Sequence, residues 1–203
     1  MRATTGGFLG LLAAALGGGT PCAAQGSLEF AGFGGLYAPS PGLLHLPGFS
    51  PGDSKGQLPQ HTASVVGARV TAWVDRQIAL ELSLDHSGLQ SSGAFGNKAD
   101  FTTGSARLLV GIVPRTSPTS VAVALGLARV TRRGSAAYSA VDFSQASWGP
   151  TFGAVGRARL APALALRAEL DDYVYYFTWS YQHDFVFSLG LSITAFRESP
   201  MPP

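Results

Sequence analysis

The sequence predicts an all-β fold, an eight-stranded antiparallel up-and-down β-barrel that crosses a membrane. Three observations lead to this prediction. In eight segments, large apolar residues alternate with small or polar residues, and a period of two is the repeat of a β-strand. After the N-terminal region, no run of roughly 18 apolar residues is available to form a membrane helix. The connections between the segments alternate between long and short, as they do in outer-membrane barrels.

Residues 1–24 have the pattern of a secretory signal peptide. Arg2 precedes an apolar stretch, and small residues surround the expected cleavage site after Ala24. We therefore expect Sec-type export. We expect residues 25–203 to form one domain, a barrel in the cell outer membrane of a diderm bacterium.

Cysteine and lysine content exclude several function classes. Cys22 is the only cysteine, so cleavage after Ala24 removes the possibility of disulfides. Acylation of Cys22 is an alternative, although the preceding Pro21 is unfavourable for it. The only lysines, Lys55 and Lys98, fall in expected loops, and no basic stripe indicates a nucleic-acid partner.

The predicted strands are long enough to cross a bilayer, because most have ten residues or more and a tilted strand needs about 9–11. Long connections follow the first, third and fifth strands, at 38–60, 88–99 and 132–145. Short turns follow the second, fourth and sixth, and the connection at 176–182 is short but rich in Tyr and Trp. The predicted strands are 27–37, 61–73, 78–87, 100–113, 120–131, 146–159, 163–175 and 183–196.

The alternation separates two faces but does not by itself say which face is inside. In 78–87, Leu80 and Leu82 alternate with Glu81 and Asp85. A membrane barrel puts the leucines toward lipid, whereas a soluble periplasmic lipocalin-like barrel puts them inside, around a small apolar ligand. The strand 120–131 favours the membrane barrel, because Ala and Gly oppose its large apolar residues and make a poor solvated face.

Charged residues of the inner face nearly balance in sign. Since an unpaired buried charge is costly, we expect them to form a paired network that holds a closed lumen. A narrow ion or proton path is the alternative. The set comprises Glu29, Arg69, Glu81, Asp85, Arg107, Arg157, Arg167, Glu169 and Asp171.

Aromatic residues near the long-loop ends of the strands are expected to form a girdle at the membrane interface. Arg129 does not fit this scheme, because its position in the alternation points it outward. Either it reaches the lipid headgroups or the register slips there. The expected girdle comprises Tyr37, Phe101, Trp148, Tyr173, Tyr175, Tyr176, Phe177, Trp179 and Tyr181.

Residues 188–196, within the last predicted strand, alternate apolar and small residues and close on an aromatic. In this pattern the chain resembles the small outer-membrane barrels of the OmpA/OmpX-like class. The resemblance implies an eight-stranded barrel and a C-terminal signal, here Gly190, Ile193 and Phe196, that the barrel assembly machinery recognises. Architecture of this kind implies a location more strongly than an activity.

A catalytic reading rests on His86 and Ser87, because some small outer-membrane barrels that modify lipid carry His and Ser on the outer wall. Adjacent strand residues point to opposite faces, so these two do not meet as base and nucleophile. We therefore expect no enzyme activity. His45, His61 and His183 are too dispersed to indicate a metal site, and no cofactor is expected.

The loop 38–60 is the expected contact surface. It carries five prolines, four glycines and the apolar Leu43, Leu44, Leu46 and Phe49, and exposed apolar loops often bind partners. The sequence thus predicts a monomeric outer-membrane barrel, in contact with lipid, that has a structural or surface-interaction role. The alternatives are a narrow channel, a lipid-modifying enzyme and the soluble binding barrel.

Overall fold

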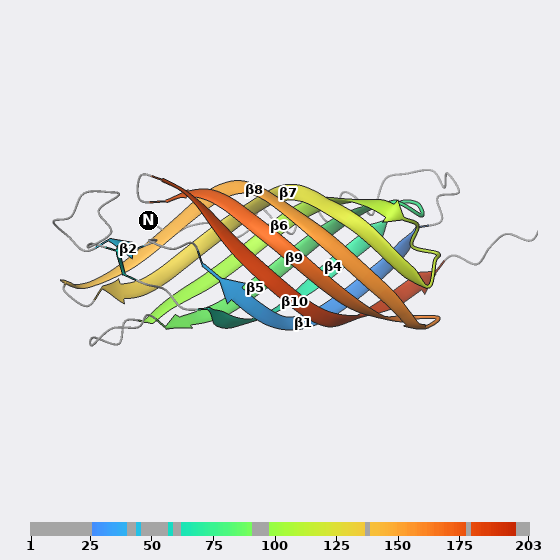
Figure 1. The fold of residues 1–203 in the computed structure, drawn as a ribbon, viewed down its shortest axis with the longest axis horizontal. Helices are drawn as coiled ribbons and strands as arrows, with labels where there is room; N and C mark the ends of the chain where they lie inside the picture. The colour runs from blue at the N-terminus through green and yellow to red at the C-terminus, as the bar shows by residue number, and fades with distance from the viewer. Residues whose placement is uncertain are drawn as a thin grey trace, which may run out of the picture.

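The computed structural model describes residues 26–39, 44–45, 57–58, 62–90, 98–136, 139–177 and 180–197. In this part of the chain, eight strands form a closed antiparallel barrel, as predicted (Figure 1). The barrel strands are β1 (Ser27–Ala38), β4 (Ala63–Trp73), β5 (Ile78–Gln90), β6 (Lys98–Val113), β7 (Thr119–Ala136), β8 (Ser139–Ala161), β9 (Leu164–Phe177) and β10 (Ser180–Arg197).

Each barrel strand pairs with its neighbours along the chain, and the pairing of β1 with β10 closes the sheet. Closure removes the free edges that an open sheet would expose in a membrane. A separate two-stranded pair, β2 (Leu44–His45) and β3 (Gln57–Leu58), lies within the segment that the sequence analysis treats as one long loop. Among the described residues, no helix is long and apolar enough to span a bilayer.

The two ends of the barrel differ. One end, here called the turn end, holds the connections 74–77, 114–118 and 162–163 together with the first residue of β1 and the last of β10. The opposite end, here called the loop end, holds the other connections. In the turn 74–77, the Asp75 carboxylate accepts hydrogen bonds from the backbone N–H groups of Gln77 and Ile78, at 2.6 and 2.7 Å.

The prediction of a long loop at 132–145 is wrong. β7 and β8 continue as a paired ladder through Arg132, which lies opposite Gln145, to the pair Ala136 and Ser139. The period of two fades beyond Thr131 because a ladder outside the lipid layer needs no apolar face, while its backbone hydrogen bonds continue. At the loop end, β7 and β8 are therefore longer than the sequence predicts.

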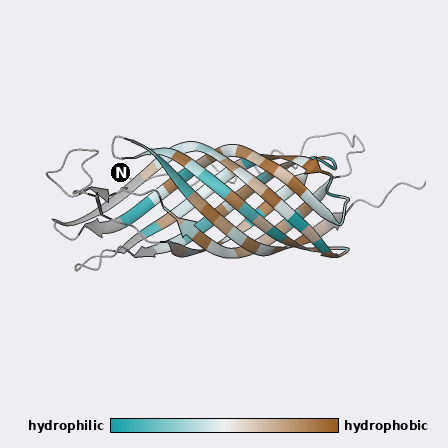
Figure 2. Cartoon of the chain, in the orientation of Figure 1, coloured by the Kyte–Doolittle hydropathy of each residue, from teal (hydrophilic) through white to brown (hydrophobic). Residues whose placement is uncertain are grey.

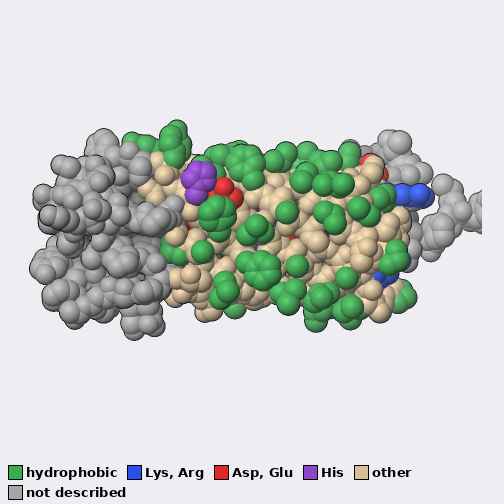
Figure 3. Space-filling view, viewed as in Figure 1, with side chains coloured by type: hydrophobic (Ala, Val, Ile, Leu, Met, Phe, Trp, Pro, Cys, Tyr) green, Lys and Arg blue, Asp and Glu red, His purple; other side chains and the backbone are tan. Residues whose placement is uncertain are grey.

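Large apolar side chains are spread over the outer face of the barrel (Figure 3), and hydrophobic and hydrophilic residues alternate along its strands (Figure 2). Leu80 and Leu189 are 57% and 49% exposed, whereas Glu81 and Asp85 are 1% and 0% exposed. This is the orientation of a membrane barrel and the opposite of a soluble one. It contradicts the lipocalin-like alternative, which puts Leu80, Leu82, Leu166 and Leu189 inside.

The register does not slip at Arg129. The residue lies opposite Gly104 on β6 and Trp148 on β8, within an unbroken ladder on both sides, and its side chain is exposed on the outer face. Of the two explanations for this residue, the register error is therefore excluded.

Candidate functional site

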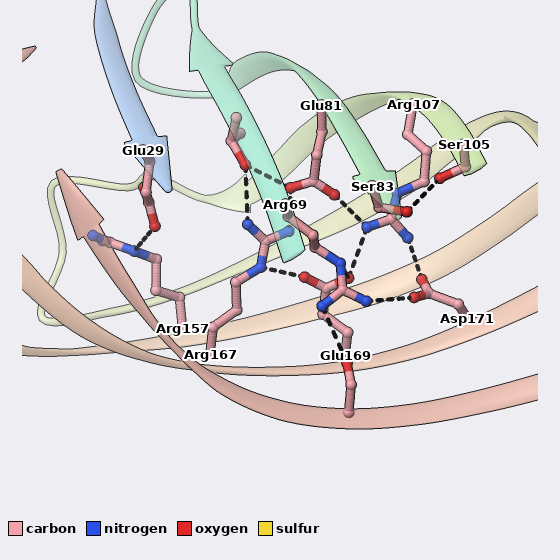
Figure 4. A network of polar contacts seen from close by, with 12 residues as sticks. Glu29, Arg69, Glu81, Ser83, Ser105, Arg107, Arg157, Arg167, Glu169 and Asp171 are labelled. Atoms are coloured by element: carbon pink, nitrogen blue, oxygen red, sulfur yellow. Dashed lines mark hydrogen bonds and ion pairs between the residues drawn. The ribbon is translucent and has the colours of Figure 1, made fainter. Parts of the chain in front are cut away.

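The centre of the lumen is filled by a network of ion pairs around Arg107 (Figure 4). Its guanidinium contacts Glu81 on β5 and both Glu169 and Asp171 on β9, and the distance to Glu169 Oε2 is 2.8 Å. All four side chains are fully buried. A planar guanidinium can satisfy several carboxylates at once, so Arg107 joins strands on opposite sides of the barrel.

Two further arginines extend this network, here called the central network. Arg69 Nη2 lies 3.2 Å from Asp171 Oδ2, and its Nε lies 3.4 Å from Glu169 Oε2. Arg167 binds Glu81 at 2.5 Å and also contacts Glu169. Three arginines thus surround three carboxylates, and a buried charge left without a partner would cost several kcal/mol.

The turn end of the lumen is closed by a smaller cluster around Glu29. Arg157 Nε donates to Glu29 Oε1 at 3.2 Å, and Trp73 Nε1 donates to Glu29 Oε2 at 3.1 Å. Arg115, from the turn between β6 and β7, lies over the Trp73 ring at 5.2 Å and donates to Ser27 of β1. The turn therefore places the Arg115 guanidinium at the turn-end opening of the barrel.

The loop end of the lumen is closed by an aromatic and charged cluster, here called the lid. The hydroxyls of Tyr37 and Tyr175 both donate to Asp184 Oδ2 at 2.6 Å. Arg132 forms an ion pair with the same carboxylate at 2.5 Å, and its guanidinium lies 5.5 Å from the Phe101 ring centre. Cation–π contacts and charged hydrogen bonds together hold these side chains across the lumen.

The lid corrects the expectation of an aromatic girdle. Tyr37, Phe101, Tyr173 and Tyr175 point into the barrel and are at most 1% exposed. Tyr173 and Tyr175 keep the alternation of Glu169 and Asp171 on the same strand, so the sequence held the signal for their direction. Trp148, Tyr176 and Tyr181 are exposed on the outer face, and the side chains of Phe177 and Trp179 lie outside the described residues.

Two members of the lid are absent from the charge set expected from the sequence. Arg132 falls in the expected loop 132–145, and Asp184 lies in the predicted strand 183–196 but was given no role. Arg132 lies two positions after the lumen residue Val130, and Asp184 lies two positions before the lumen residue Val186. Each therefore faces the lumen by the period of two. The alternation within 183–196 already points Asp184 inward, and extending the period past the end of 120–131 would have found Arg132.

The structure places the whole predicted charge set in the lumen. Eight of the nine residues make ion pairs with one another or with Arg115. Asp85 is the exception. Its Oδ2 accepts a 2.5 Å hydrogen bond from Tyr173, and its Oδ1 has no partner among the described residues.

Two members of the expected assembly signal have clear positions. Gly190 lies beside Phe33, where a Cβ would approach the Gly32 carbonyl oxygen to 2.3 Å. A side chain at this position would collide with the neighbouring strand, so glycine is required for packing. Ile193 is exposed on the outer wall, whereas the side chain of Phe196 lies outside the described residues.

The residues considered for catalysis and metal binding are dispersed. His86 is exposed on the wall with Nδ1 3.1 Å from Thr102 Oγ1, while Ser87 is buried and donates to the Ser64 carbonyl. His183 lies outside the barrel, 3.0 Å from Asp172. The side chain of His45 and all of Asp53 and His61 lie outside the described residues, within which no three potential ligands cluster.

Comparison with known proteins shows a likeness of fold. No family model matches the chain, and no curated protein matches it. Among solved structures, the outer-membrane protein OprG of Pseudomonas aeruginosa is similar with a TM-score of 0.58 and 12% identity, over 84% of this chain and 96% of that chain. Neisserial surface protein A gives 0.55 and 10%, over 83% and 96%.

The N-terminal β-barrel domain of OprF from Pseudomonas aeruginosa gives a TM-score of 0.54 and 15% identity, over 83% of this chain and 96% of that domain. With its closed sheet, apolar wall and charged lumen, the chain is a small transmembrane β-barrel. Its architecture is that of eight-stranded outer-membrane proteins.

Proposed function

We propose that the protein is an outer-membrane barrel with a closed lumen and a structural or surface-interaction role. The observation that carries this proposal is the filled lumen. The Glu29 cluster, the central network and the lid follow one another along the barrel axis. An eight-stranded barrel is narrow enough to be filled by its own side chains, and here charged and polar side chains contact one another across the lumen.

The small size of the cavity at the turn end supports a closed lumen. A cavity lined in part by Trp73, Val155, Arg157 and Arg167 has a volume of about 10 Å³, which is close to the minimum for one water molecule. A hydrated ion needs more room than this. The narrow-channel alternative therefore requires these arginines to move.

Planar-bilayer recording tests closure. We expect the refolded barrel to insert without discrete conductance steps, and we expect the Arg132→Ala variant to remain silent because the central network still blocks the lumen below the lid. Reproducible conductance steps from the unmodified barrel would make a channel the better function. Proof of folding comes from a heat-dependent shift in gel mobility.

The location is tested by cell fractionation. A protein that is exported through the predicted signal peptide and recognised by the barrel assembly machinery resides in the outer membrane. We therefore expect it in the outer-membrane fraction. Recovery from the soluble periplasmic fraction would contradict this part of the proposal. Loss of heat-modifiable barrel after Phe196→Ala would support the assembly role of the terminal strand.

We also propose that the segment 38–60 provides the contact surface for a partner. Its apolar residues and its position between β1 and β4, at the loop end, support this role. Protease shaving of intact cells removes such a segment while leaving the barrel in place. Unchanged adhesion or partner binding after shaving would count against a surface role.

We propose no catalytic role, since His86 and Ser87 face opposite sides of β5. The test is the mass spectrum of lipid A from cells with and without the protein. Loss of an acyl chain that depends on the protein would establish the lipid-modifying alternative.

A further inference from the structure

A polar patch interrupts the apolar wall at the loop end of β5, β6 and β7. It consists of His86, Thr102, Arg129, Thr131 and Arg133. Thr102 lies directly opposite His86 on one side and Thr131 on the other, and the two arginines flank Thr131 on the same face of β7. The histidine and both arginines are exposed on the outer face.

The surroundings of Arg129 place it where the apolar wall ends. Toward the turn end the wall continues with Leu84 and Leu127, each 61% exposed. Trp148 lies opposite Arg129 on β8 and is 60% exposed. On the other side lies Gly104, where an added Cβ would meet nothing within 4 Å. Arg129 therefore borders open space on a lipid-facing surface.

Among the described residues, no acidic residue lies directly opposite Arg129 on this face. Its partners across the ladder are Gly104 and Trp148, whereas Arg133 lies opposite Asp100. Among the described residues, no carboxylate forms an ion pair with Arg129. An arginine on the lipid face costs about 2–4 kcal/mol at the bilayer midplane and little near the interface, so this position marks the headgroup level.

We infer that the polar patch binds the phosphate of an anionic lipid headgroup. Arg129 supplies the charge and two donors in the planar geometry that phosphate accepts. The hydroxyls of Thr102 and Thr131 offer further donors beside it. Leu84 and Leu127 lie where the acyl chains of the same lipid would pack. The inference rests on the proposed residence in the outer membrane and adds a particular lipid site to it.

Trp148 makes the site measurable. The chain has three tryptophans, of which Trp73 is 7% exposed within the lumen and shielded from lipid. In a Trp179→Phe background, lipid quenching therefore reports on Trp148 beside Arg129. The barrel is refolded into dioleoylphosphatidylcholine vesicles containing a minor fraction of brominated phosphatidylglycerol or brominated phosphatidylcholine, and the relative association constant of the two lipids is obtained from the quenching.

We expect brominated phosphatidylglycerol to be preferred about fivefold, equivalent to the contribution of about 1 kcal/mol from one basic residue near an anionic surface. Arg129→Gln should reduce the preference to about one, and Arg129→Lys should retain most of it. Arg76→Gln, at an exposed position in the turn 74–77, is the matched control and should leave the preference unchanged.

Two outcomes of the quenching experiment would overturn the inference. One is an equal association of both lipids with a barrel whose heat-dependent mobility shift shows that it is folded. The other is an unchanged preference in Arg129→Gln. Neither outcome bears on outer-membrane residence, which fractionation tests separately. Competition by unlabelled lipid A and by unlabelled phosphatidylglycerol identifies the source of the phosphate, and competition by neither would also overturn the site.

Discussion

Tyr173 on β9 donates a 2.5 Å hydrogen bond to Asp85 on β5, across the full width of the lumen. Three strands separate β5 from β9 in either direction around the barrel. Both side chains are completely buried. This bond lies between the central network and the lid, and it is the only hydrogen bond of the Asp85 carboxyl group among the described residues.

Removal of the Tyr173 hydroxyl should therefore destabilise the barrel. In Tyr173→Phe the buried Asp85 carboxyl group loses its donor, and we expect the free energy of unfolding to fall by about 1–3 kcal/mol. Urea unfolding in lipid vesicles measures the change. Tyr176→Phe is the control, because Tyr176 is 50% exposed on the outer wall. An equal effect of both substitutions would show that the bond across the lumen is not responsible.

Removal of the Arg107 guanidinium should lower the stability of the barrel more than removal of the Tyr173 hydroxyl. Arg107→Met leaves the buried carboxylates of Glu81, Glu169 and Asp171 with one cation fewer, and breaking such a buried pair costs about 3–5 kcal/mol. The temperature at which the folded gel band disappears should fall markedly. Adding Glu81→Gln to Arg107→Met should recover part of the loss, since coupled residues are not additive. Strict additivity would argue against a single network.

Two glycines of the wall should respond differently to alanine. A Cβ at Gly67 would approach the Phe33 ring to 2.2 Å and the Leu84 carbonyl oxygen to 2.5 Å, whereas a Cβ at Gly104 meets nothing within 4 Å. Gly67→Ala should lower the free energy of unfolding by about 1–3 kcal/mol. Gly104→Ala should leave it unchanged or raise it slightly. Chemical unfolding of the two variants side by side tests the difference.

Asp75 should show a titration linked to the turn between β4 and β5. The backbone N–H groups of Gln77 and Ile78 hold the pKa of the Asp75 carboxyl below its ordinary value of 3.8. A lowered pKa in the folded state stabilises the fold above the unfolded value, and this contribution disappears as the pH falls through the folded value. NMR titration of the carboxyl carbon should give a pKa below 3.8. A value at or above it would contradict the bonding.

An Asp75→Asn variant provides the control for this titration. It removes the ionisable group while keeping an acceptor oxygen in the turn. The unfolding midpoint of the unmodified barrel should therefore fall more steeply than that of the variant as the pH drops below 3.8. Identical pH profiles for the two proteins would show that Asp75 contributes nothing to the pH dependence.

The sequence by itself determined the strand number, the strand order and the two faces. The alternation of Leu80 with Glu81 and of Leu166 with Arg167 requires no knowledge of distant contacts, because adjacent strand residues always point to opposite faces. The connections at the turn end could also be predicted, since the period of two along the strands breaks at each of them. The same rule points Tyr175 into the lumen at the end of 163–175, and applied beyond the end of 120–131 it would have placed Arg132 there as well.

Only the tertiary structure decided which charges meet. Arg107 and Asp171 are 64 residues apart in the chain, and their contact depends on barrel closure and on the stagger of all the strands between them. The lid likewise joins β1, β7, β9 and β10 through Tyr37, Arg132, Tyr175 and Asp184. Local alternation fixes the direction of a side chain, whereas its partner is fixed by the register summed around a closed sheet.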